Sequence, residues 1–324
     1  MTTVGVNISH HASVFIKNKN EYYEEDRFNK KKYWQPSKDN WDYKSFFKIK
    51  NFNSDFIFTS YGRVNTNDDD NDHYIINKLC EKYNIKNWLF KEYEHHLYHV
   101  CCGFYFSPFD EAVCIVVDAG GARYSLTNYA VPRLAYQEGD SIYFINKTNI
   151  KPLYKLYTNC KYHFYINNDD NLFKSIKLIK SGENPHEDFS KKNDTEFKFT
   201  TLPNSAMLFN ILCDYLNYPN HGHDAGKVMG LSSYGKNVGS RKEDVAKQVQ
   251  EFTKEQTILL IEKAISLSNC KNIILSGGYA LNCVNNYAYT KHFKDLNFFI
   301  DPCSHDGGTS IGAASWYDNY YRKT

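Results

Sequence analysis

Three glycine turns, each following an expected strand, constrain the fold of this chain more than any other feature. They lie at Gly120-Gly121, Gly277-Gly278 and Gly307-Gly308. Glycine has no Cβ, so backbone N–H groups at such a turn can approach phosphate oxygens, and a helix that begins there adds a favourable dipole. One such turn is weak evidence, but three indicate a nucleotide cleft. Neither G-x-G-x-x-G nor a P-loop lysine motif is present, which argues against dinucleotide-binding and P-loop folds.

Both halves of the chain share one plan, although we find no sequence repeat of 20–50 residues. Each half has strands, then a glycine turn after a strand, then a helical pattern. This plan predicts an α/β fold with two related lobes around a cleft. We expect the first lobe over residues 1–140, an insertion over 141–203 that ends in a flexible connector from residue 181, and the second lobe over 204–324.

Composition and charge exclude several classes of protein. The 324 residues are 42% hydrophobic and carry a net charge of +2, so no basic field favours a large nucleic acid or a membrane surface. The apolar runs are far shorter than the roughly 20 residues of a membrane span, and the N-terminus has no secretion signal. Nine cysteines without a C-x-x-C pair indicate free thiols. We therefore expect a cytoplasmic protein.

A histidine pair provides the strongest local signal for chemistry. His95 and His99 are four residues apart in an expected helix over 92–106, which places them on one face and lets two imidazoles reach one metal ion. A structural histidine cluster is the alternative reading of this pair. Asp118, at the end of an expected strand, and Asp306, beside the third glycine turn, would complete a ligand set. Mixed nitrogen and oxygen ligation suits Fe(II), Mn(II) or Zn(II).

Seven ordered motifs over nearly the whole chain resemble those of a known family. They are similar to the Kae-like, nucleotide-binding half of the O-carbamoyltransferases of antibiotic and nodulation-factor biosynthesis, the NodU/CmcH/TobZ type. The motifs are G-V-N with H-H-A-S from Gly5, E-E-D-R-F from Glu24, H-H-L-Y-H with S-P-F-D-E-A from His95, V-D from Val117, G-K-V-M-G-L-x-x-Y-G from Gly226, G-G-x-A-L-N-C from Gly277, and D-G-G with G-A-A from Asp306.

The resemblance implies the actin/Hsp70-like (ASKHA) fold, with two α/β lobes around a nucleotide. It also implies transfer of a carbamoyl group from carbamoyl adenylate to a hydroxyl, assisted by a divalent metal for which iron is expected before zinc or manganese. By position, the ligands would be His95, His99, Asp118 and Asp306, with His10 and His95 as catalytic residues. The implied nucleotide contacts are Lys227, Gly230, Gly277, Gly278, Asn282 and Gly307.

The sequence departs from the family pattern at three points. His11 stands where the motif has aspartate, Ala-Gly-Gly follows Asp118, and the chain ends at Thr324, where family members continue into an adenylating (YrdC-like) domain. We therefore expect this domain to be absent and a partner to supply carbamoyl adenylate from carbamoyl phosphate and ATP.

The identity of the acceptor stays open at this stage. A sugar, an antibiotic-like alcohol or a hydroxymethylated nucleotide would each offer the required hydroxyl, and a homodimer is also left open. The alternative function is a non-catalytic nucleotide-binding subunit of a carbamoylating complex. Carbamoylation of a tRNA base is disfavoured by the near-neutral charge.

Overall fold

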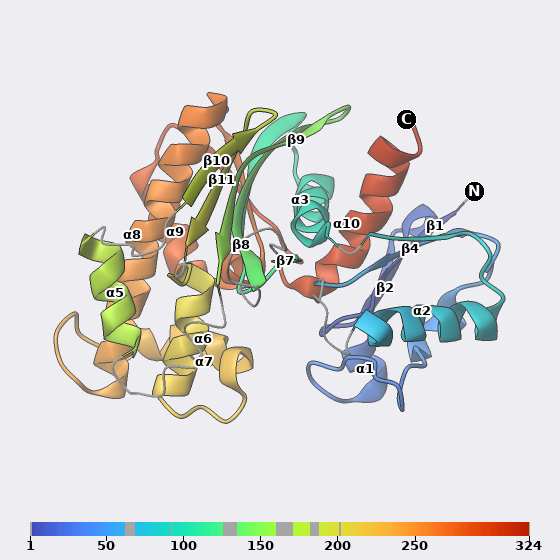
Figure 1. The fold of residues 1–324 in the computed structure, drawn as a ribbon, viewed down its shortest axis with the longest axis horizontal. Helices are drawn as coiled ribbons and strands as arrows, with labels where there is room; N and C mark the ends of the chain where they lie inside the picture. Colours follow the sequence, from blue (N-terminus) through green and yellow to red (C-terminus); the bar gives the residue numbers. More distant parts are fainter. Residues whose placement is uncertain are drawn as a thin grey trace.

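Two β-sheets organise the computed structural model, which describes residues 2–61, 69–91, 93–125, 135–159, 171–181, 188–200 and 202–323 (Figure 1). The first sheet has the strand order β3-β2-β1-β4-β5. Its strands are β1 (Thr3–Asn7), β2 (Ser13–Ile16), β3 (Glu21–Glu24), β4 (Asp55–Thr59) and β5 (Trp88–Phe90). The second sheet has the order β10-β11-β9-β8-β6-β12-β13, with β7 paired to β8. Its strands are β6 (Glu111–Val117), β7 (Arg123–Ser125), β8 (Ala135–Asn146), β9 (Ile150–Thr158), β10 (Asp188–Lys192), β11 (Thr195–Thr200), β12 (Asn272–Ser276) and β13 (Asn297–Ile300).

The two sheets repeat one topology. In the first, β1 is antiparallel to β2 and parallel to β4, while β3 and β5 extend the two sides. In the second, β6 occupies the place of β1, with β8 and β9 on its antiparallel side and β12 and β13 on its parallel side. The prediction of two related α/β lobes is therefore confirmed.

The sheets divide the chain differently from the predicted boundaries. Residue 140 lies inside β8, and β6 belongs to the second sheet because it pairs with β8 on one side and β12 on the other. The flexible connector predicted from residue 181 is wrong where the chain is described, because β10 and β11 extend the second sheet beyond β9. Phe197 and Phe199 stack on Tyr157 with ring centroids 6.4 and 5.3 Å apart, and this period-2 alternation marks β11 as a strand.

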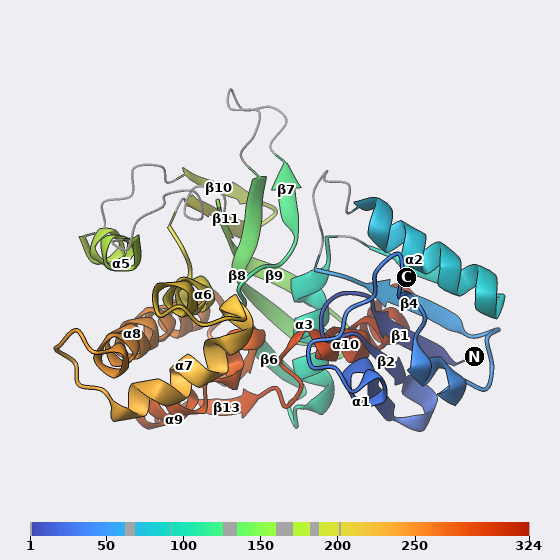
Figure 2. The ribbon, with the colours of Figure 1, turned by 90° about the horizontal axis from the view of Figure 1, so that it is seen from below.

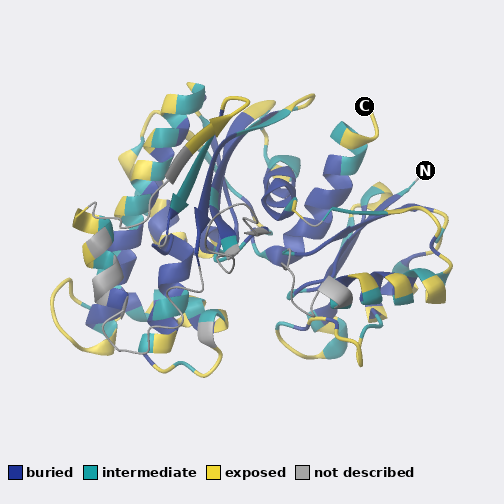
Figure 3. Ribbon diagram, in the orientation of Figure 1, coloured by how far each residue is buried: buried dark blue, intermediate teal, exposed yellow. Residues whose placement is uncertain are grey.

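Two helices lie between the sheets, α3 (His95–Phe106) and α10 (Thr309–Trp316) (Figure 1). Each follows the last strand of one sheet and packs on the other sheet. Helix α3 follows β5 and contacts β6 and β12, whereas α10 follows β13 and contacts β1 and β4. The helices also contact one another, and both are largely buried (Figure 3). This exchange brings segments from both halves of the chain to one region.

The remaining described helices lie on the outer sides of the sheets, where α7 packs on α6 and α8, and α5 packs on α6 (Figure 2). They are α1 (Glu25–Asn29), α2 (Asp69–Tyr83), α5 (Asn171–Ser181), α6 (Ser205–Tyr215), α7 (Ala225–Leu231), α8 (Lys242–Ser268) and α9 (Cys283–His292). Short 3-10 turns span Lys17–Lys19, Lys44–Lys48, His221–Asp224, Ser232–Tyr234, Gly278–Leu281 and Asp306–Gly308, and a π turn spans Tyr317–Tyr321. Among the described residues, no helix has both the length and the apolar character needed to cross a bilayer.

Candidate metal centre

Helix α3 carries the predicted histidine pair at its first turn. His95 and His99 are both fully buried, and their Nε2 atoms are 3.2 Å apart. The helical spacing of four residues produces this approach, because it places the two imidazoles on one face, one turn apart. The predicted helix and the shared face of the two histidines are therefore confirmed.

Two aspartates from distant segments reach the same point. Asp118 directly follows β6, and Asp306 begins the 3-10 turn that leads into α10. The Nε2 atom of His95 lies 3.3 Å from Oδ2 of Asp118 and 3.7 Å from Oδ1 of Asp306. The Nε2 atom of His99 lies 3.8 Å from each of these oxygens. One ligand atom from each of the four residues lies within 4.8 Å of the other three.

The chemistry of these four atoms fits a divalent cation. Two imidazole nitrogens and two carboxylate oxygens face one buried space, and the two carboxylates make this space electrostatically unfavourable without a positive charge. Metal–ligand bonds of ~2.0–2.2 Å in tetrahedral geometry place ligand atoms about 3.3–3.6 Å apart. Five of the six separations lie between 3.2 and 3.8 Å and bracket that range, and all six are within 4.8 Å. A mixed set of nitrogen and oxygen ligands accommodates Fe(II), Mn(II) or Zn(II).

Backbone N–H groups orient the Asp118 carboxylate. Its Oδ1 accepts hydrogen bonds from the backbone N–H of Ala119, at 2.9 Å, and of Gly278, at 3.2 Å. This leaves Oδ2 facing the histidines. Gly277 has a left-handed φ of 86°, and a Cβ there would crowd the carbonyl oxygen of Val117 at 2.5 Å. The second glycine turn therefore brings a backbone donor onto a candidate ligand.

The electrostatics of the site also favour a positive charge. Burial lowers the pKa of His95, but the charges of Asp306 and Asp118 outweigh it and hold this pKa above its ordinary value. Burial raises the pKa of Asp306, but the positive charge of His10 and His95 outweighs it and holds that pKa well below its ordinary value. Both shifts reflect the attraction between these imidazoles and the two carboxylates.

His10 contacts the same site from the turn between β1 and β2. Its Nε2 lies 3.0 Å from Oδ2 of Asp306, and 33% of its side chain is exposed. The side chain of Asn7 donates hydrogen bonds to the carbonyl oxygens of His10 and His11, at 3.1 and 3.2 Å, which hold the turn. Asp306 thus faces His95 and His99 with Oδ1 and His10 with Oδ2. The structure brings the predicted catalytic pair, His10 and His95, to one carboxylate.

The predicted nucleotide-binding residues occupy two different settings. Gly277, Gly278 and Gly307 lie beside the aspartates of the metal centre. Lys227 and Gly230 lie on α7, where the Lys227 ammonium pairs with Asp224 at 2.7 Å and 58% of the lysine side chain is exposed. Asn282 is buried, caps α9 and exchanges hydrogen bonds with Gln250. Nucleotide contacts by all six residues stay a prediction.

An aromatic and imidazole cluster beside His10 was not predicted from the sequence. The ring of His223 lies 5.8 Å from that of His10 and stacks on Tyr33 at 4.4 Å. The ring of His11 lies 4.9 Å from His305 and 5.0 Å from Tyr33. Burial and the nearby charges of His305 and His10 lower the pKa of His11 to about 4. His223 and His305 lie just before two of the sequence motifs, those from Gly226 and Asp306, but no spacing rule links them to His10.

A buried charged network lies behind α3. The His96 Nδ1–H donates to the Ser141 hydroxyl at 2.9 Å, and this hydroxyl donates to Oε1 of Glu138 at 2.7 Å. The Lys155 ammonium lies 2.9 Å from the same oxygen. Burial raises the pKa of Glu138, but the charges of His96 and Lys155 outweigh it and lower this pKa to about 2.

We expect Glu138→Gln to destabilise the protein in a pH-dependent way. At pH 7 the substitution leaves Lys155 buried without its counter-charge and lowers the free energy of unfolding by about 3 kcal/mol. Because the pKa of Glu138 is lower in the folded state than in the unfolded state, its contribution is present above about pH 4.5 and falls as the pH drops. The difference from the parent should shrink by about 2 kcal/mol between pH 5 and pH 3. Urea unfolding of the variant and the parent at each pH measures this difference in the free energy of unfolding.

The surface pair of Asp42 and Lys82 supplies the matched control. Asp42→Asn removes an ion pair whose two side chains are each nearly half exposed, so its effect should stay below about 1 kcal/mol at every pH. An equal loss of stability for Glu138→Gln at pH 3 and pH 7 would contradict the assigned pKa shift.

The described geometry can be compared with known proteins. The family profile described as "Carbamoyltransferase N-terminus" matches residues 12–315. The chain belongs to the carbamoyltransferase family.

The chain is 26% identical over 254 residues to an uncharacterized protein of Synechocystis, sll1178. This match covers 72% of this chain and 37% of that protein. The chain is 23% identical over 235 residues to the nodulation protein NolNO of Sinorhizobium fredii, which covers 69% of this chain and 31% of that protein. The chain thus spans roughly a third of the length of these relatives.

Solved structures show the fold of this chain. The HypF protein of T. kodakarensis superposes with a TM-score of 0.56 at 12% identity, covering 99% of this chain and 48% of that one. A ROK family protein of Streptococcus pneumoniae, solved with sucrose, superposes with a TM-score of 0.51 at 10% identity over the full length of both chains. These likenesses confirm the predicted ASKHA fold, and the family assignment confirms the resemblance of the seven motifs.

Proposed function

We propose that this carbamoyltransferase transfers a carbamoyl group from carbamoyl adenylate to a hydroxyl of a small molecule or nucleotide at the His95–His99–Asp118–Asp306 centre. One observation carries the proposal: these four donors, from segments far apart in the chain, lie within 4.8 Å of one another, and His10 contacts one of them. Membership of the family supports carbamoyl transfer. The acceptor, the metal and the adenylate donor are parts of the proposal.

The residues of the centre would hold a divalent metal, with iron as the first expectation and zinc or manganese as the others. When bound, such a cation supplies Lewis-acid stabilisation of the negative charge that develops on the carbamoyl oxygen and on the leaving phosphate. Gly277, Gly278 and Gly307 stand next to the ligands, which supports the proposal that the backbone of this region meets ribose or phosphate. Asn282, Lys227 and Gly230 are proposed for the nucleoside side.

His10 would accept the hydroxyl proton of the acceptor molecule. The Nε2 atom of His10 lies 3.0 Å from Oδ2 of Asp306, and this carboxylate would favour the tautomer that has its proton on Nε2 and its lone pair on Nδ1. The acceptor oxygen attacks the carbamoyl carbon, the bond from that carbon to the phosphate oxygen breaks, and AMP leaves with the electron pair. The hydroxyl proton passes to His10, whose imidazole titrates near neutral pH when unperturbed.

A partner would supply the activated carbamoyl group. In this scheme an adenylating domain makes carbamoyl adenylate from carbamoyl phosphate and ATP, and passes it to the cleft. We also propose a cytoplasmic location, which is supported by eight free cysteines among the described residues.

A reconstituted assay tests the proposed function. The chain is incubated with carbamoyl phosphate, ATP, an adenylating domain from a relative, a divalent metal and a panel of sugars, alcohols and hydroxymethylated nucleotides. The expected result is a mass gain of one carbamoyl group on an acceptor, lost when the chain or the metal is left out. ATP binding without transfer to any acceptor would contradict the proposal and favour the non-catalytic subunit.

We expect His10→Asn to lower kcat by about 10²- to 10³-fold, because it removes the proposed proton acceptor and leaves the metal ligands in place. Steady-state kinetics measure the loss, and metal content should equal that of the parent. His292→Asn, an exposed histidine on α9, is the matched control. A variant at His10 with unchanged kcat would remove this residue from the mechanism.

A further inference from the structure

A buried amide reaches the backbone of Asp118 from outside the metal centre. Asn204 is 5% exposed and forms the N-cap of α6, where its Oδ1 accepts from the Met207 N–H at 2.9 Å. Its Nδ2 donates to the carbonyl oxygen of Asp118 at 2.8 Å and to Oδ1 of Asp140 at 2.7 Å. Both amide protons and the amide oxygen are thus engaged.

Asn204 adds a side-chain hydrogen bond to Asp118, whose N–H and Oδ1 form hydrogen bonds with backbone groups. The Asp118 N–H donates to the carbonyl oxygen of Gly139 at 3.1 Å, and Oδ1 accepts from Ala119 and Gly278. The bond from Asn204 restrains the peptide plane that follows Asp118. A rotation of this plane would shift the carboxylate relative to His95, and ligand geometry tolerates only small errors.

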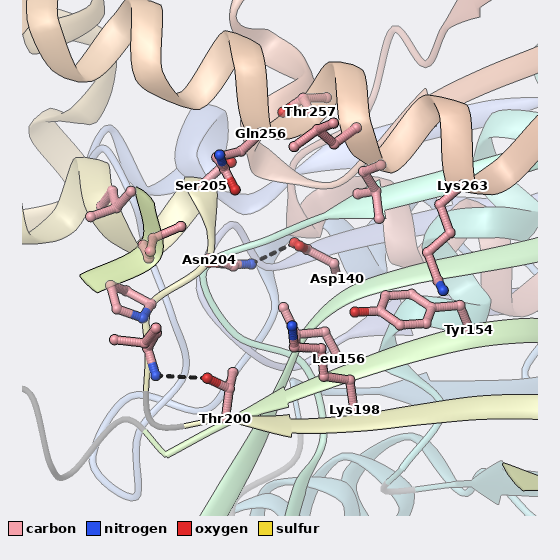
Figure 4. Close-up of a pocket in the computed structure, with 16 residues that line it drawn as sticks. Asp140, Tyr154, Leu156, Lys198, Thr200, Asn204, Ser205, Gln256, Thr257 and Lys263 are labelled. Atoms are coloured by element: carbon pink, nitrogen blue, oxygen red, sulfur yellow. Dashed lines mark hydrogen bonds between the residues drawn. The ribbon is translucent and has the colours of Figure 1, made fainter. Parts of the chain in front are cut away.

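Asp140 holds the Asn204 amide in the orientation that this bond requires. Both residues line a cavity of about 280 Å³ between β9, β11, α6 and α8 (Figure 4). The Asn204–Asp140 hydrogen bond crosses the part of the cavity nearest the start of α6 (Figure 4). Leu156, Thr200 and Leu208 form other parts of the wall. Because the cavity adjoins both side chains, smaller residues at these two positions can be accommodated without repacking the core.

We propose that Asn204, oriented by Asp140, is a positioning residue that sets how Asp118 presents its carboxylate to the metal. This inference rests on the proposed function, because it assigns Asp118 as a ligand. Helix capping alone would not require asparagine, since serine or aspartate caps equally well. Only an amide at this position both accepts from Met207 and donates to Asp118 and Asp140.

Four variants separate positioning from capping. Asn204→Ser keeps a cap for α6 but loses both donated bonds, and Asp140→Ala removes the acceptor that orients the amide. Asp140→Asn retains an acceptor oxygen and should rescue the parent behaviour. Gln256, on α8, lines the same cavity, and Gln256→Ala serves as the matched control.

Cobalt binding and hydrogen exchange measure the effect. We expect Asn204→Ser to weaken Co²⁺ binding by about 10- to 100-fold and to change its visible absorption spectrum. Asp140→Ala should have a smaller effect of the same kind, while Asp140→Asn and Gln256→Ala should match the parent. In the metal-free protein, amide exchange should rise in the peptide that covers residues 118–122 and stay unchanged in α6. In the transfer assay, kcat should fall more than KM changes.

Two results would overturn the inference. One is parent-like Co²⁺ affinity and spectrum in Asn204→Ser, and the other is faster exchange confined to α6, which would mean capping alone. If the parent binds no Co²⁺ at the four ligands, as judged against His95→Ala, the metal part of the proposed function fails. The exchange of residues 118–122 then decides the positioning role by itself.

Discussion

Replacing His95 by alanine should abolish binding of the divalent metal and reduce carbamoyl transfer by at least about 10³-fold. His95 contributes the Nε2 atom that lies nearest to both His99 and Asp118 in the ligand set, at 3.2 and 3.3 Å. Its loss leaves three donors and removes charge stabilisation where the transfer is proposed to occur. Elemental analysis after dialysis against the metal, together with the reconstituted transfer assay, measures both effects.

The control for this variant is His73→Ala, an exposed histidine on α2. It should keep the metal content and the activity of the parent. Circular dichroism and melting temperature establish that His95→Ala is folded. Full metal content in folded His95→Ala would rule out the four-residue centre, and full activity without metal would rule out its role in transfer.

Replacing Gly312 by alanine should destabilise the protein by about 3 kcal/mol or more. Gly312 lies in α10 where this helix crosses α3, and a Cβ would overlap the carbonyl oxygen of Tyr98. Gly5 in β1 meets the carbonyl oxygen of Ser310 on α10 in the same way. Because the atom that a Cβ at position 312 would overlap belongs to the backbone of α3, α10 would have to move away from α3. Urea unfolding at pH 7 measures the change.

A second glycine provides a control with the opposite expected sign. Gly226 lies in α7, and a Cβ there would meet no atom within 4 Å. Gly226→Ala should leave stability unchanged or raise it by up to about 1 kcal/mol, because alanine favours helix more than glycine does. If Gly312→Ala were as stable as Gly226→Ala, the close crossing of α3 and α10 would be wrong.

Local pattern predicted much of what the structure contains. The four-residue spacing of His95 and His99 predicted a shared helical face, and the apolar run over 112–117 predicted the strand that ends at Asp118. Both predictions depend only on residues that are close in the sequence, which explains why they were correct. The strand β11 was missed although Phe197 and Phe199 alternate with Glu196 and Lys198, because this short pattern lies in a stretch, 181–203, that is otherwise rich in polar residues, glycine and proline.

The sequence by itself determined the family, the two-lobed α/β fold and the four residues proposed to hold a metal. Only the tertiary structure decided that His95, Asp118 and Asp306 meet, and that Asn204 bonds to Asp118 across 86 positions of chain. The reason is that helical and strand periods act over a few residues. The meeting of these groups depends instead on α3 and α10 packing on each other's sheets, at distances that glycines without a Cβ allow.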